Sequence, residues 1–87
     1  MYYVYFLLCK NGKIYTGSTN NLKERLKRHT KGEVFFTKNL LPVKLVGYVA
    51  VQNKYTAFNL EKYFKSGSGR AFIKKHKLVE SQEASQE

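Results

Sequence analysis

The chain has 87 residues, a single cysteine and a formal net charge of +10. This length allows one domain with one modest core, so any catalytic site must lie on the surface of a single layer of sheet or helix. The lone cysteine, Cys9, excludes a disulfide framework and a thiolate zinc site, and it favours a reducing cytoplasm.

Positive charge is concentrated in residues 1–79. All six acidic residues are Glu, and three of them lie in residues 80–87, which leaves three Glu against all sixteen Lys and Arg in the rest of the chain. An excess of this size favours a polyanionic partner, because each cation placed on a phosphate releases a condensed counterion. We therefore expect a nucleic acid partner, DNA or RNA, although a basic domain with merely solvated lysines would have the same composition. No membrane partner is expected, since the basic residues do not line one amphipathic helix.

An N-terminal β-hairpin is predicted by two β-prone segments around a turn. Residues 2–8 are aromatic and β-branched, Asn11-Gly12 is a strong turn signal, and residues 13–17 are β-prone again. Cys9, at the end of the first segment, is interpreted as a small buried hydrophobe and not as a nucleophile.

The length of the hairpin loop decides where the tyrosines of the hairpin point. A two-residue loop at Asn11-Gly12 would place Tyr5 and Tyr15 on opposite faces of the sheet. A three-residue loop, with Gly12 in the left-handed conformation of a bulge, pairs Leu7 with Tyr15 and puts both tyrosines on one face. We predict the three-residue loop.

A helix and an ordered loop are predicted after the hairpin. Either Asn20 or Asn21 can cap the helix, and Gly32 ends it. Residues 32–42 mix Gly, Thr, Asn and Pro with the apolar residues 34–36. This composition predicts a loop that is tucked against the body of the protein by its aromatic rings.

Arg25 and His29 of this helix are predicted to share one rim. Each lies three residues after an apolar contact of the helix, Leu22 or Leu26, and the two are four residues apart. Both side chains should therefore project near the edge of the buried face.

The second half of the chain predicts a strand and two helices. Valine-rich residues 43–51 form the strand, in which Gly47 marks either a bulge or a close approach of backbone, and a helix follows over about residues 56–65. Residues 66–69, Ser-Gly-Ser-Gly, interrupt this helix before a short basic helix over residues 70–77.

The element order β-β-α-β-α-α predicts an α+β fold, in which a small, three-stranded, mostly antiparallel sheet is flanked by three helices. This single domain spans residues 1–79, and the acidic, polar tail 80–87 should be disordered. The predicted core consists of Val4, Phe6, Leu8, Ile14, Leu22, Leu26, Leu45, Val49, Leu60, Phe64 and Phe72.

Glu61 places a carboxylate on the apolar face of the second predicted helix. It shares a helical stripe with Ala57, Leu60 and Phe64. A buried, unpaired carboxylate is strongly unfavourable, so Glu61 needs a partner. That partner is a hydrogen-bonding group, a nearby Lys or Arg, or a metal ion.

Four short motifs, taken in order, resemble those of the GIY-YIG endonuclease superfamily. Tyr3-Val4-Tyr5 and Tyr15-Thr16-Gly17 correspond to the two halves of the name motif, and the helical segment 21–29 and Glu61 follow at the family's spacing. The resemblance covers about residues 2–78. It is greatest to small stand-alone bacterial members, which are similar to the N-terminal nuclease domain of the excision-repair endonuclease.

The resemblance implies metal-dependent hydrolysis of a phosphodiester by Tyr5, Tyr15, Arg25, His29 and Glu61. Glu61 would hold Mg²⁺, with Mn²⁺ as a substitute, and Arg25 would grip a phosphate and stabilise charge on its phosphorus. Tyr15 would act as the base or position the attacking water, with Tyr5 hydrogen-bonded nearby. Neighbouring cations would lower the pKa of Tyr15, and His29 would assist the proton transfer. In the competing interpretation, the two tyrosines are half-buried aromatic residues of the strands, and Arg25 and His29 are ordinary residues of the helix surface.

The predicted function is that of a DNA endonuclease with low intrinsic sequence specificity, related to DNA repair or recombination. A homodimer or a targeting protein is expected to choose the site of cleavage. The alternative is a non-catalytic DNA or RNA binder that keeps the fold. In both cases the predicted phosphate contacts come from Lys23, Lys27, Arg28, Arg70, Lys74, Lys75 and Lys77.

Overall fold

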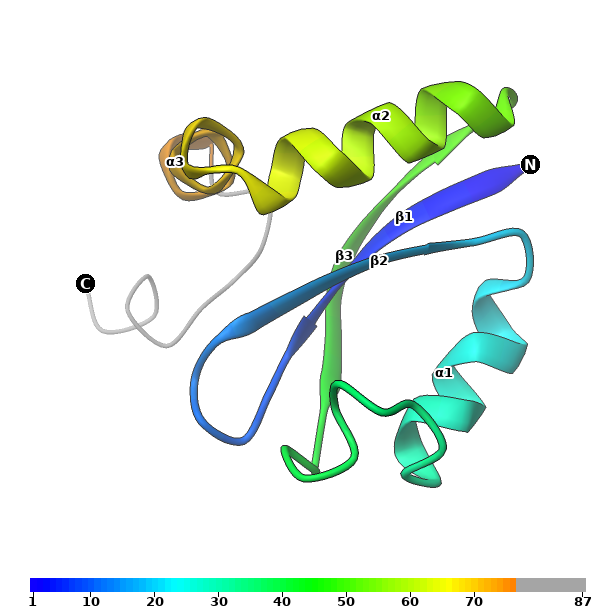
Figure 1. Cartoon of the computed structure of the whole chain (residues 1–87), viewed down its shortest axis with the longest axis vertical. Coiled ribbons are helices and arrows are strands. Elements are labelled where there is room, and N and C mark those ends of the chain that lie inside the picture. The colour runs from blue at the N-terminus through cyan, green and yellow to red at the C-terminus, as the bar shows by residue number, and fades with distance from the viewer. Residues whose placement is uncertain (77–87) are drawn as a thin grey trace.

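Three antiparallel strands form a sheet with helices on both sides. The computed structural model describes residues 1–76, which contain β1 (Tyr2–Leu8), β2 (Ile14–Thr19), α1 (Leu22–Thr30), β3 (Lys44–Val51), α2 (Lys54–Lys65) and α3 (Gly67–His76). β1 is the middle strand, in the order β2-β1-β3. Figure 1 shows α1 on one side of the sheet and α2 on the other, with α3 at the end of α2. The predicted α+β fold and element order are confirmed, while Lys77 and the tail 80–87 lie outside the described residues.

The register of the sheet is the predicted one. Gly12 ends a three-residue hairpin loop with a φ of +83°. Leu7 lies opposite Tyr15, so the side chains of Tyr15 and Tyr5 point to the same face of the sheet. In β3 a bulge at Gly47, one of the two predicted alternatives, is also present, because the pairing with β1 shifts register there.

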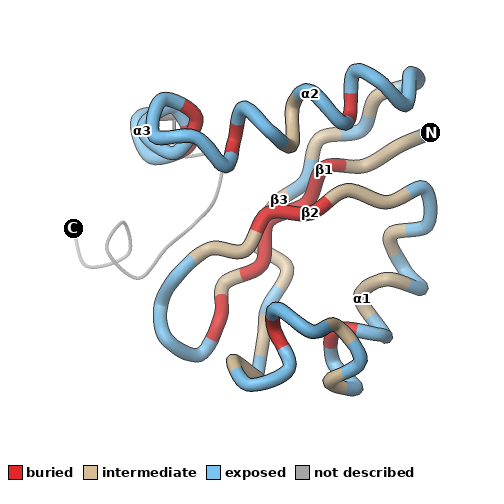
Figure 2. The backbone as a smooth tube through the Cα atoms, viewed as in Figure 1, coloured by how far each residue is buried: buried red, intermediate tan, exposed pale blue. Residues whose placement is uncertain are grey.

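One face of the sheet forms the main core beneath α2 and α3. Val4 and Phe6 of β1 pack with Ala57, Phe64 and Ile73, all of which are 6% exposed or less. The rings of Phe6 and Phe64 meet edge to face with centroids 5.2 Å apart. Figure 2 shows buried residues at the middle of the sheet and on α2. This packing fixes α2, and therefore the carboxylate it carries, on one face of the sheet.

The prediction that Phe72 belongs to the core is wrong. Its side chain is 39% exposed, whereas the neighbouring Ile73 is 6% exposed. α3 begins at Gly67, three residues before its predicted start, and it directs Ile73 inward. Phe72 instead packs near the surface against Tyr63, with ring centroids 6.2 Å apart. Several other predicted core residues are only partly buried: Leu8, Ile14, Leu22, Leu26, Leu45, Val49 and Leu60.

The opposite face of β1 is as deeply buried as the main core. Tyr5 and Leu7 are both 0% exposed. Because both faces of this central strand are covered, the four successive residues Val4–Leu7 are all buried, and the strand lacks the alternation of a half-solvated strand. The predicted core, which takes only even-numbered residues from this strand, is therefore incomplete.

The prediction that aromatic rings tuck the loop after α1 against the body is wrong. Phe35 and Phe36 are 73% and 71% exposed. Thr37 is buried in their place, and the Leu40 carbonyl accepts a hydrogen bond of 2.8 Å from the Lys10 amide. The loop is thus anchored by polar contacts, which leave both phenyl rings at the surface.

Asparagine side chains set the starts of α1 and α2. The Asn21 side chain accepts a hydrogen bond of 3.1 Å from the Glu24 amide, which decides between the two predicted caps. The Asn53 side chain accepts from the Tyr55 amide at 2.7 Å, so α2 begins two residues before its predicted start. Within residues 1–76, no helix has the length and apolar character needed to cross a membrane.

Ser66 alone separates α2 from α3, instead of the predicted break over residues 66–69. Its hydroxyl donates to the Tyr63 carbonyl and accepts from the Gly69 amide at 3.1 Å, so one residue caps both helices. The sharp turn brings Gly69 against α2. A Cβ at that position would lie 1.9 Å from the Tyr63 carbonyl oxygen and 2.6 Å from the Phe64 Cα. Only glycine fits at this crossing.

Gly69→Ala should destabilise the protein by about 1–3 kcal/mol, because the added methyl group overpacks the α2–α3 crossing. Gly67→Ala is the matched control in the same helix, since a Cβ there meets no atom within 4 Å. Its better helix propensity should leave stability unchanged or raise it by up to about 1 kcal/mol. Urea denaturation of both variants measures the difference, and equal midpoints would contradict the proposed crossing.

Candidate active site

Tyr5, His29 and Thr37 form a buried hydrogen-bonded chain. All three residues are 0% exposed. The Tyr5 hydroxyl lies 2.8 Å from Nε2 of His29, and Nδ1 of the same ring lies 2.8 Å from the Thr37 hydroxyl. β1, α1 and the loop after α1 each supply one member of the chain. The prediction that His29 projects at the rim of its helix is therefore wrong, because the loop covers it.

The His29 imidazole is held in its neutral form. Burial lowers the pKa of His29 below its ordinary value of 6.5, and the positive charges of Arg25 and Arg28 lower this pKa further. A neutral imidazole has one donor and one acceptor nitrogen, so the Tyr5 and Thr37 hydroxyls must play opposite roles. One tautomer of the neutral ring accepts a hydrogen bond from the Tyr5 hydroxyl and donates one to Thr37, and the other tautomer reverses both roles.

Gly17 makes room for the ring of Tyr5. The two residues lie opposite each other on neighbouring strands. A Cβ on Gly17 would lie 2.6 Å from the Tyr5 hydroxyl oxygen and 3.1 Å from Cε2 of Tyr15. Any side chain at this position would push Tyr5 away from His29, so the glycine that closes the second motif has a steric explanation.

Tyr15 flanks the same chain from β2. Its ring centroid lies 5.3 Å from that of His29 and 6.4 Å from that of Tyr5. Tyr15 is only partly buried, whereas Tyr5 is fully buried. Of the two tyrosines, Tyr15 is therefore the one that a substrate can reach.

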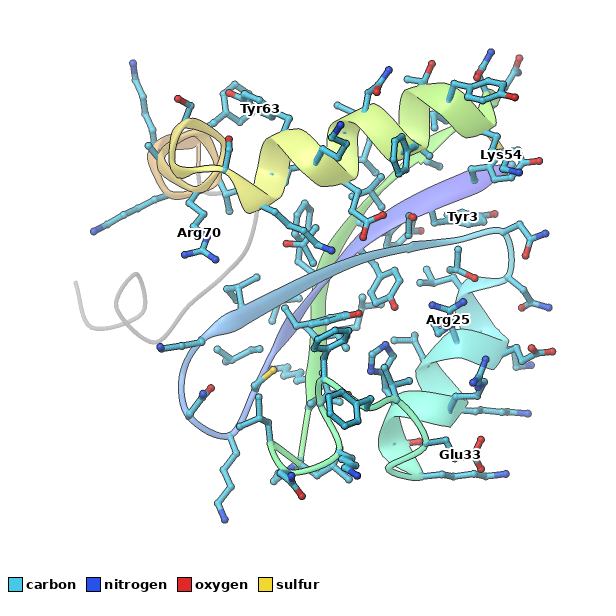
Figure 3. All side chains as sticks on the ribbon, in the orientation of Figure 1. Tyr3, Arg25, Glu33, Lys54, Tyr63 and Arg70 are labelled. Atoms are coloured by element: carbon cyan, nitrogen blue, oxygen red, sulfur yellow. The ribbon has the colours of Figure 1, made fainter. Side chains whose placement is uncertain are left out.

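Arg25 is the charge common to the whole cluster. Its side chain extends from α1 toward the sheet (Figure 3) and is partly buried. Burial has the largest influence on the pKa of Tyr5, Tyr15, His29 and Glu61, and Arg25 contributes to the pKa of each of the four. Arg25 also lies close enough to Tyr5 to lower the pKa of that residue, against the effect of burial. One guanidinium therefore acts on groups that come from both faces of the sheet.

Glu61 reaches the edge strand β2 from α2. One carboxylate oxygen accepts a hydrogen bond of 2.6 Å from the Ser18 hydroxyl, and the other accepts one of 2.7 Å from the Lys65 ammonium. The Glu61 side chain is 19% exposed. Burial raises the pKa of Glu61, but the hydrogen bonds from Lys65 and Ser18 and the charges of Lys65 and Arg25 together bring it below its ordinary value. Glu61 is therefore ionised at neutral pH.

Both tyrosines are protonated at neutral pH in this structure. Burial and the neighbouring Tyr15 raise the pKa of Tyr5 to about 12, although Arg25 opposes this rise. Burial also raises the pKa of Tyr15, with Glu61 in the same direction and the cations Lys65 and Arg25 against it. The predicted cations are present beside Tyr15, but burial outweighs them. Deprotonation of Tyr15 near neutral pH therefore needs additional positive charge.

Glu61 fits a metal ion that takes a single protein carboxylate. No group of three or more His, Cys, Asp or Glu side chains that could hold a metal occurs in residues 1–76. Mg²⁺ often takes one or two carboxylates and completes its shell with water and substrate phosphate oxygens. The two Glu61 oxygens each accept one hydrogen bond and keep further acceptor capacity. The donor set thus suits a metal that is bound together with a phosphate.

The predicted phosphate-binding residues do not form one surface. Six of them are exposed: Lys23, Lys27 and Arg28 on α1, and Arg70, Lys74 and Lys75 on α3. The sheet separates α1 from α3 (Figure 1), so the two groups lie on different sides of the molecule. Arg28 is also 3.9 Å from Glu33, in a pair that is about half exposed and therefore weak. The group on α1 shares its helix with Arg25 and is the nearer in sequence to the tyrosine cluster.

The sequence interpretation missed Thr37, Lys65 and the role of Ser18. Lys65 had a signal, because it lies four residues after Glu61 on the same helix, which is the spacing of an ion pair. Thr37 had none, because its contact with His29 depends on the path of the loop. Ser18 meets Glu61 across 43 positions of sequence, so only the packing of α2 on β2 reveals the contact.

The stability of the protein should fall as pH drops below about 6.5, because the unfolded chain binds a proton at His29 more readily than the folded chain does. The slope is at most about 1.4 kcal/mol per pH unit. Urea denaturation between pH 7.5 and 5.5, in a His76→Gln background so that one histidine titrates, measures it. His29→Asn should remove the slope, and an NMR titration of the His29 ring in the folded protein checks the direction independently. A slope unchanged in His29→Asn would show that another group titrates.

Comparison with known proteins identifies the family of the chain. The family model for the GIY-YIG catalytic domain matches residues 1–77. A UPF0213 protein of Clostridium perfringens is 46% identical over 66 residues, which cover 75% of this chain and 71% of the relative. A UPF0213 protein of Streptococcus agalactiae is 39% identical over 79 residues, covering 86% of this chain and 90% of the relative. The corresponding protein of Lactococcus lactis is 38% identical over 85 residues, covering 97% and 72%.

No solved structure matches the chain significantly. The family match covers every described helix and strand, from β1 to α3. The chain belongs to the GIY-YIG family, and its relatives are the small GIY-YIG proteins designated UPF0213.

Proposed function

We propose that this protein is a divalent-metal-dependent DNA endonuclease that hydrolyses phosphodiester bonds. A GIY-YIG catalytic domain implies a nuclease. The observation that carries the proposal is the meeting of Tyr15, Arg25 and an ionised Glu61 at the edge strand β2, from three separate elements. A protein that only binds nucleic acid has no use for a carboxylate at this position, because the negative charge of Glu61 repels phosphate.

Arg25 and Glu61 are assigned to the phosphate and the metal. The planar guanidinium of Arg25 can hold two phosphate oxygens and stabilise the charge that builds up around phosphorus. Glu61 is the residue that would hold Mg²⁺ or Mn²⁺. When bound, such an ion neutralises phosphate charge and lowers the pKa of nearby groups. The Lys65 ammonium, which donates a hydrogen bond to one Glu61 oxygen in this structure, could then contact the phosphate or Tyr15 instead.

Tyr15 is assigned to the attacking water, with a buried acceptor behind it. Its hydroxyl, the more accessible of the two, can orient the water, and once positive charge at the site has driven its own proton into solvent, the phenolate can take a proton from that water. Tyr5 lies 2.8 Å from the neutral ring of His29, which can accept a hydrogen bond from the Tyr5 hydroxyl. Thr37 on the far side of the ring fixes its orientation. The buried chain would thus hold Tyr5 and the His29 ring in fixed positions behind Tyr15.

A non-catalytic nucleic-acid binder is the second candidate. The observation in its favour is the ion pair between Glu61 and Lys65 at 2.7 Å, which satisfies the carboxylate without a metal. In both candidates the basic residues of α1 meet phosphates. For the nuclease, low intrinsic sequence specificity follows from the small size of the domain, and a second copy or a targeting protein would select the DNA.

Glu61→Gln should abolish cleavage while DNA binding is retained. The variant keeps the shape of the side chain and removes its charge, so cleavage of supercoiled plasmid and of labelled branched DNA should fall by about 100-fold or more. Wild type should cleave in Mg²⁺ or Mn²⁺ and not in EDTA. Glu33→Gln is the matched control, because Glu33 is an exposed carboxylate with one weak partner, and it should cleave within twofold of wild type.

Cleavage by Glu61→Gln at the wild-type rate would remove Glu61 from the mechanism. Metal-independent cleavage by wild type would remove the metal. If no protein cleaves either DNA, yet all bind it with an affinity that falls steeply with salt, the non-catalytic binder is the correct function.

Tyr15→Phe should lower the cleavage rate by about 10²–10⁴-fold, because the ring and its contacts remain while the hydroxyl that handles the proton is lost. DNA affinity should stay within twofold of wild type. Tyr55→Phe, at a tyrosine that is 73% exposed on α2, is the control for loss of a tyrosine hydroxyl. Equal rates for Tyr15→Phe and Tyr55→Phe would exclude Tyr15 from proton transfer.

A further inference from the structure

A groove of about 450 Å³ lies beside the tyrosine cluster, between the sheet and the start of α1. This volume falls in the range of sites that hold small molecules or parts of larger ligands. No step of the proposed cleavage uses it. Its walls come from β1, β3 and the first turns of α1, and they include Tyr3, Tyr48, Asn20, Leu22, Lys23 and Leu26.

Two tyrosines form the aromatic wall of the groove. The rings of Tyr3 and Tyr48 meet edge to face, with centroids 5.9 Å apart at 68°. Tyr48 is 54% exposed, although it lies on the central part of β3. A large aromatic ring left open beside a groove offers a flat surface for stacking.

The groove adjoins the candidate active site directly. Tyr48 lies opposite Tyr5 across β1 and β3, so both side chains point to the same face of the sheet. Tyr3 lies two residues before Tyr5 on that face, which is about 7 Å along a strand. Figure 3 shows Tyr3 and Arg25 near the same end of the sheet. A nucleic acid strand whose phosphate is held by Arg25 would therefore pass a neighbouring nucleotide over this groove.

The lining suits a nucleobase. A base has two π faces, which stack on aromatic rings, and a polar edge, which hydrogen bonds to amides. Among the lining residues, the Asn20 carboxamide can supply donors and an acceptor, Leu22 and Leu26 supply apolar surface, and Lys23 can meet the phosphate of the same nucleotide. The overall charge of +10 favours a polyanionic strand over another basic copy of this chain.

We propose that this groove binds an unpaired nucleobase next to the scissile phosphate, with Tyr48 as the stacking residue. A base inside a duplex is stacked and paired, and it can enter the groove only after it is unstacked. The preferred substrate is consequently DNA with single-stranded nucleotides at the cleavage point, such as a branch, a flap or a single strand. The proposal rests on the proposed function for the position of the scissile phosphate, while base binding itself does not require cleavage.

Tyr48→Leu tests the proposal, because leucine keeps an apolar side chain in the strand and removes the stacking face. Fluorescence anisotropy with a labelled oligothymidylate should show binding about tenfold weaker than that of wild type. Binding to a duplex of the same length should change by less than twofold. Tyr48→Phe, which keeps the ring, and Tyr55→Leu, which removes an exposed tyrosine on α2, should both bind the single strand within twofold of wild type.

Three outcomes would overturn the proposal. The first is single-strand binding by Tyr48→Leu at wild-type affinity, and the second is an equal loss for single strand and duplex. The third is a wild-type dimer in analytical ultracentrifugation that Tyr48→Leu dissociates while its DNA affinity stays unchanged, since the groove would then be a protein interface.

The failure of the nuclease proposal is distinguishable from the failure of this one. If wild type does not cleave DNA and Tyr48→Leu still loses single-strand binding selectively, the groove binds a base in a non-catalytic protein. If wild type cleaves and Tyr48→Leu cleaves and binds single-stranded and branched DNA as wild type does, the nuclease stands and the groove has no part in substrate binding. Circular dichroism of each variant verifies that the affinities refer to folded protein.

Discussion

The hydrogen bond between the Tyr5 hydroxyl and Nε2 of His29 joins the central strand to α1, and the rest of the site depends on this contact. His29 is the one fully buried residue of α1. The helix therefore docks on the sheet largely through a polar side chain, whose other nitrogen meets Thr37. Loss of either partner would leave a buried polar atom unpaired, at a cost of about 1–3 kcal/mol. The contact that positions Arg25 over the sheet is thus the same contact that organises the buried tyrosine.

Burial and charge oppose each other at this site, and burial prevails in the free protein. Arg25 and Lys65 both lower the pKa of Tyr15, yet its pKa remains above the ordinary value. An incoming phosphate adds negative charge, which by itself would raise this pKa further. If Tyr15 gives up its proton near neutral pH, positive charge must enter with the substrate. A divalent ion at Glu61 would supply this charge, so the proposed metal dependence agrees with the burial of the tyrosines as well as with the presence of a carboxylate.

Local signals predicted the elements and their register, and long-range packing accounts for what they missed. The Asn11-Gly12 turn allowed two loop lengths, and the three-residue loop that we predicted places Tyr5 and Tyr15 on one face, because loop length fixes the pairing of a hairpin. The burial of His29 could not be predicted in this way, because the residues that cover it lie in an irregular loop. The exposure of Phe35 also contradicts the usual tendency of aromatic residues, since that loop is anchored by polar groups. Periodicity reports the face of a helix, but it does not report which loop will close over that face.

The position of the site at an edge strand explains how so short a chain can assemble it. β2 pairs only with β1, so its outer margin is open to groups from both faces of the sheet. Arg25 approaches this margin from the α1 side, and Glu61 approaches it from the α2 side and accepts a hydrogen bond from Ser18 of β2. If the site lay at a central strand, the full thickness of the sheet would separate the side chains of Arg25 and Glu61. The edge allows opposite charges from two layers to act on one substrate group, and a domain with a single sheet needs no second lobe to enclose it.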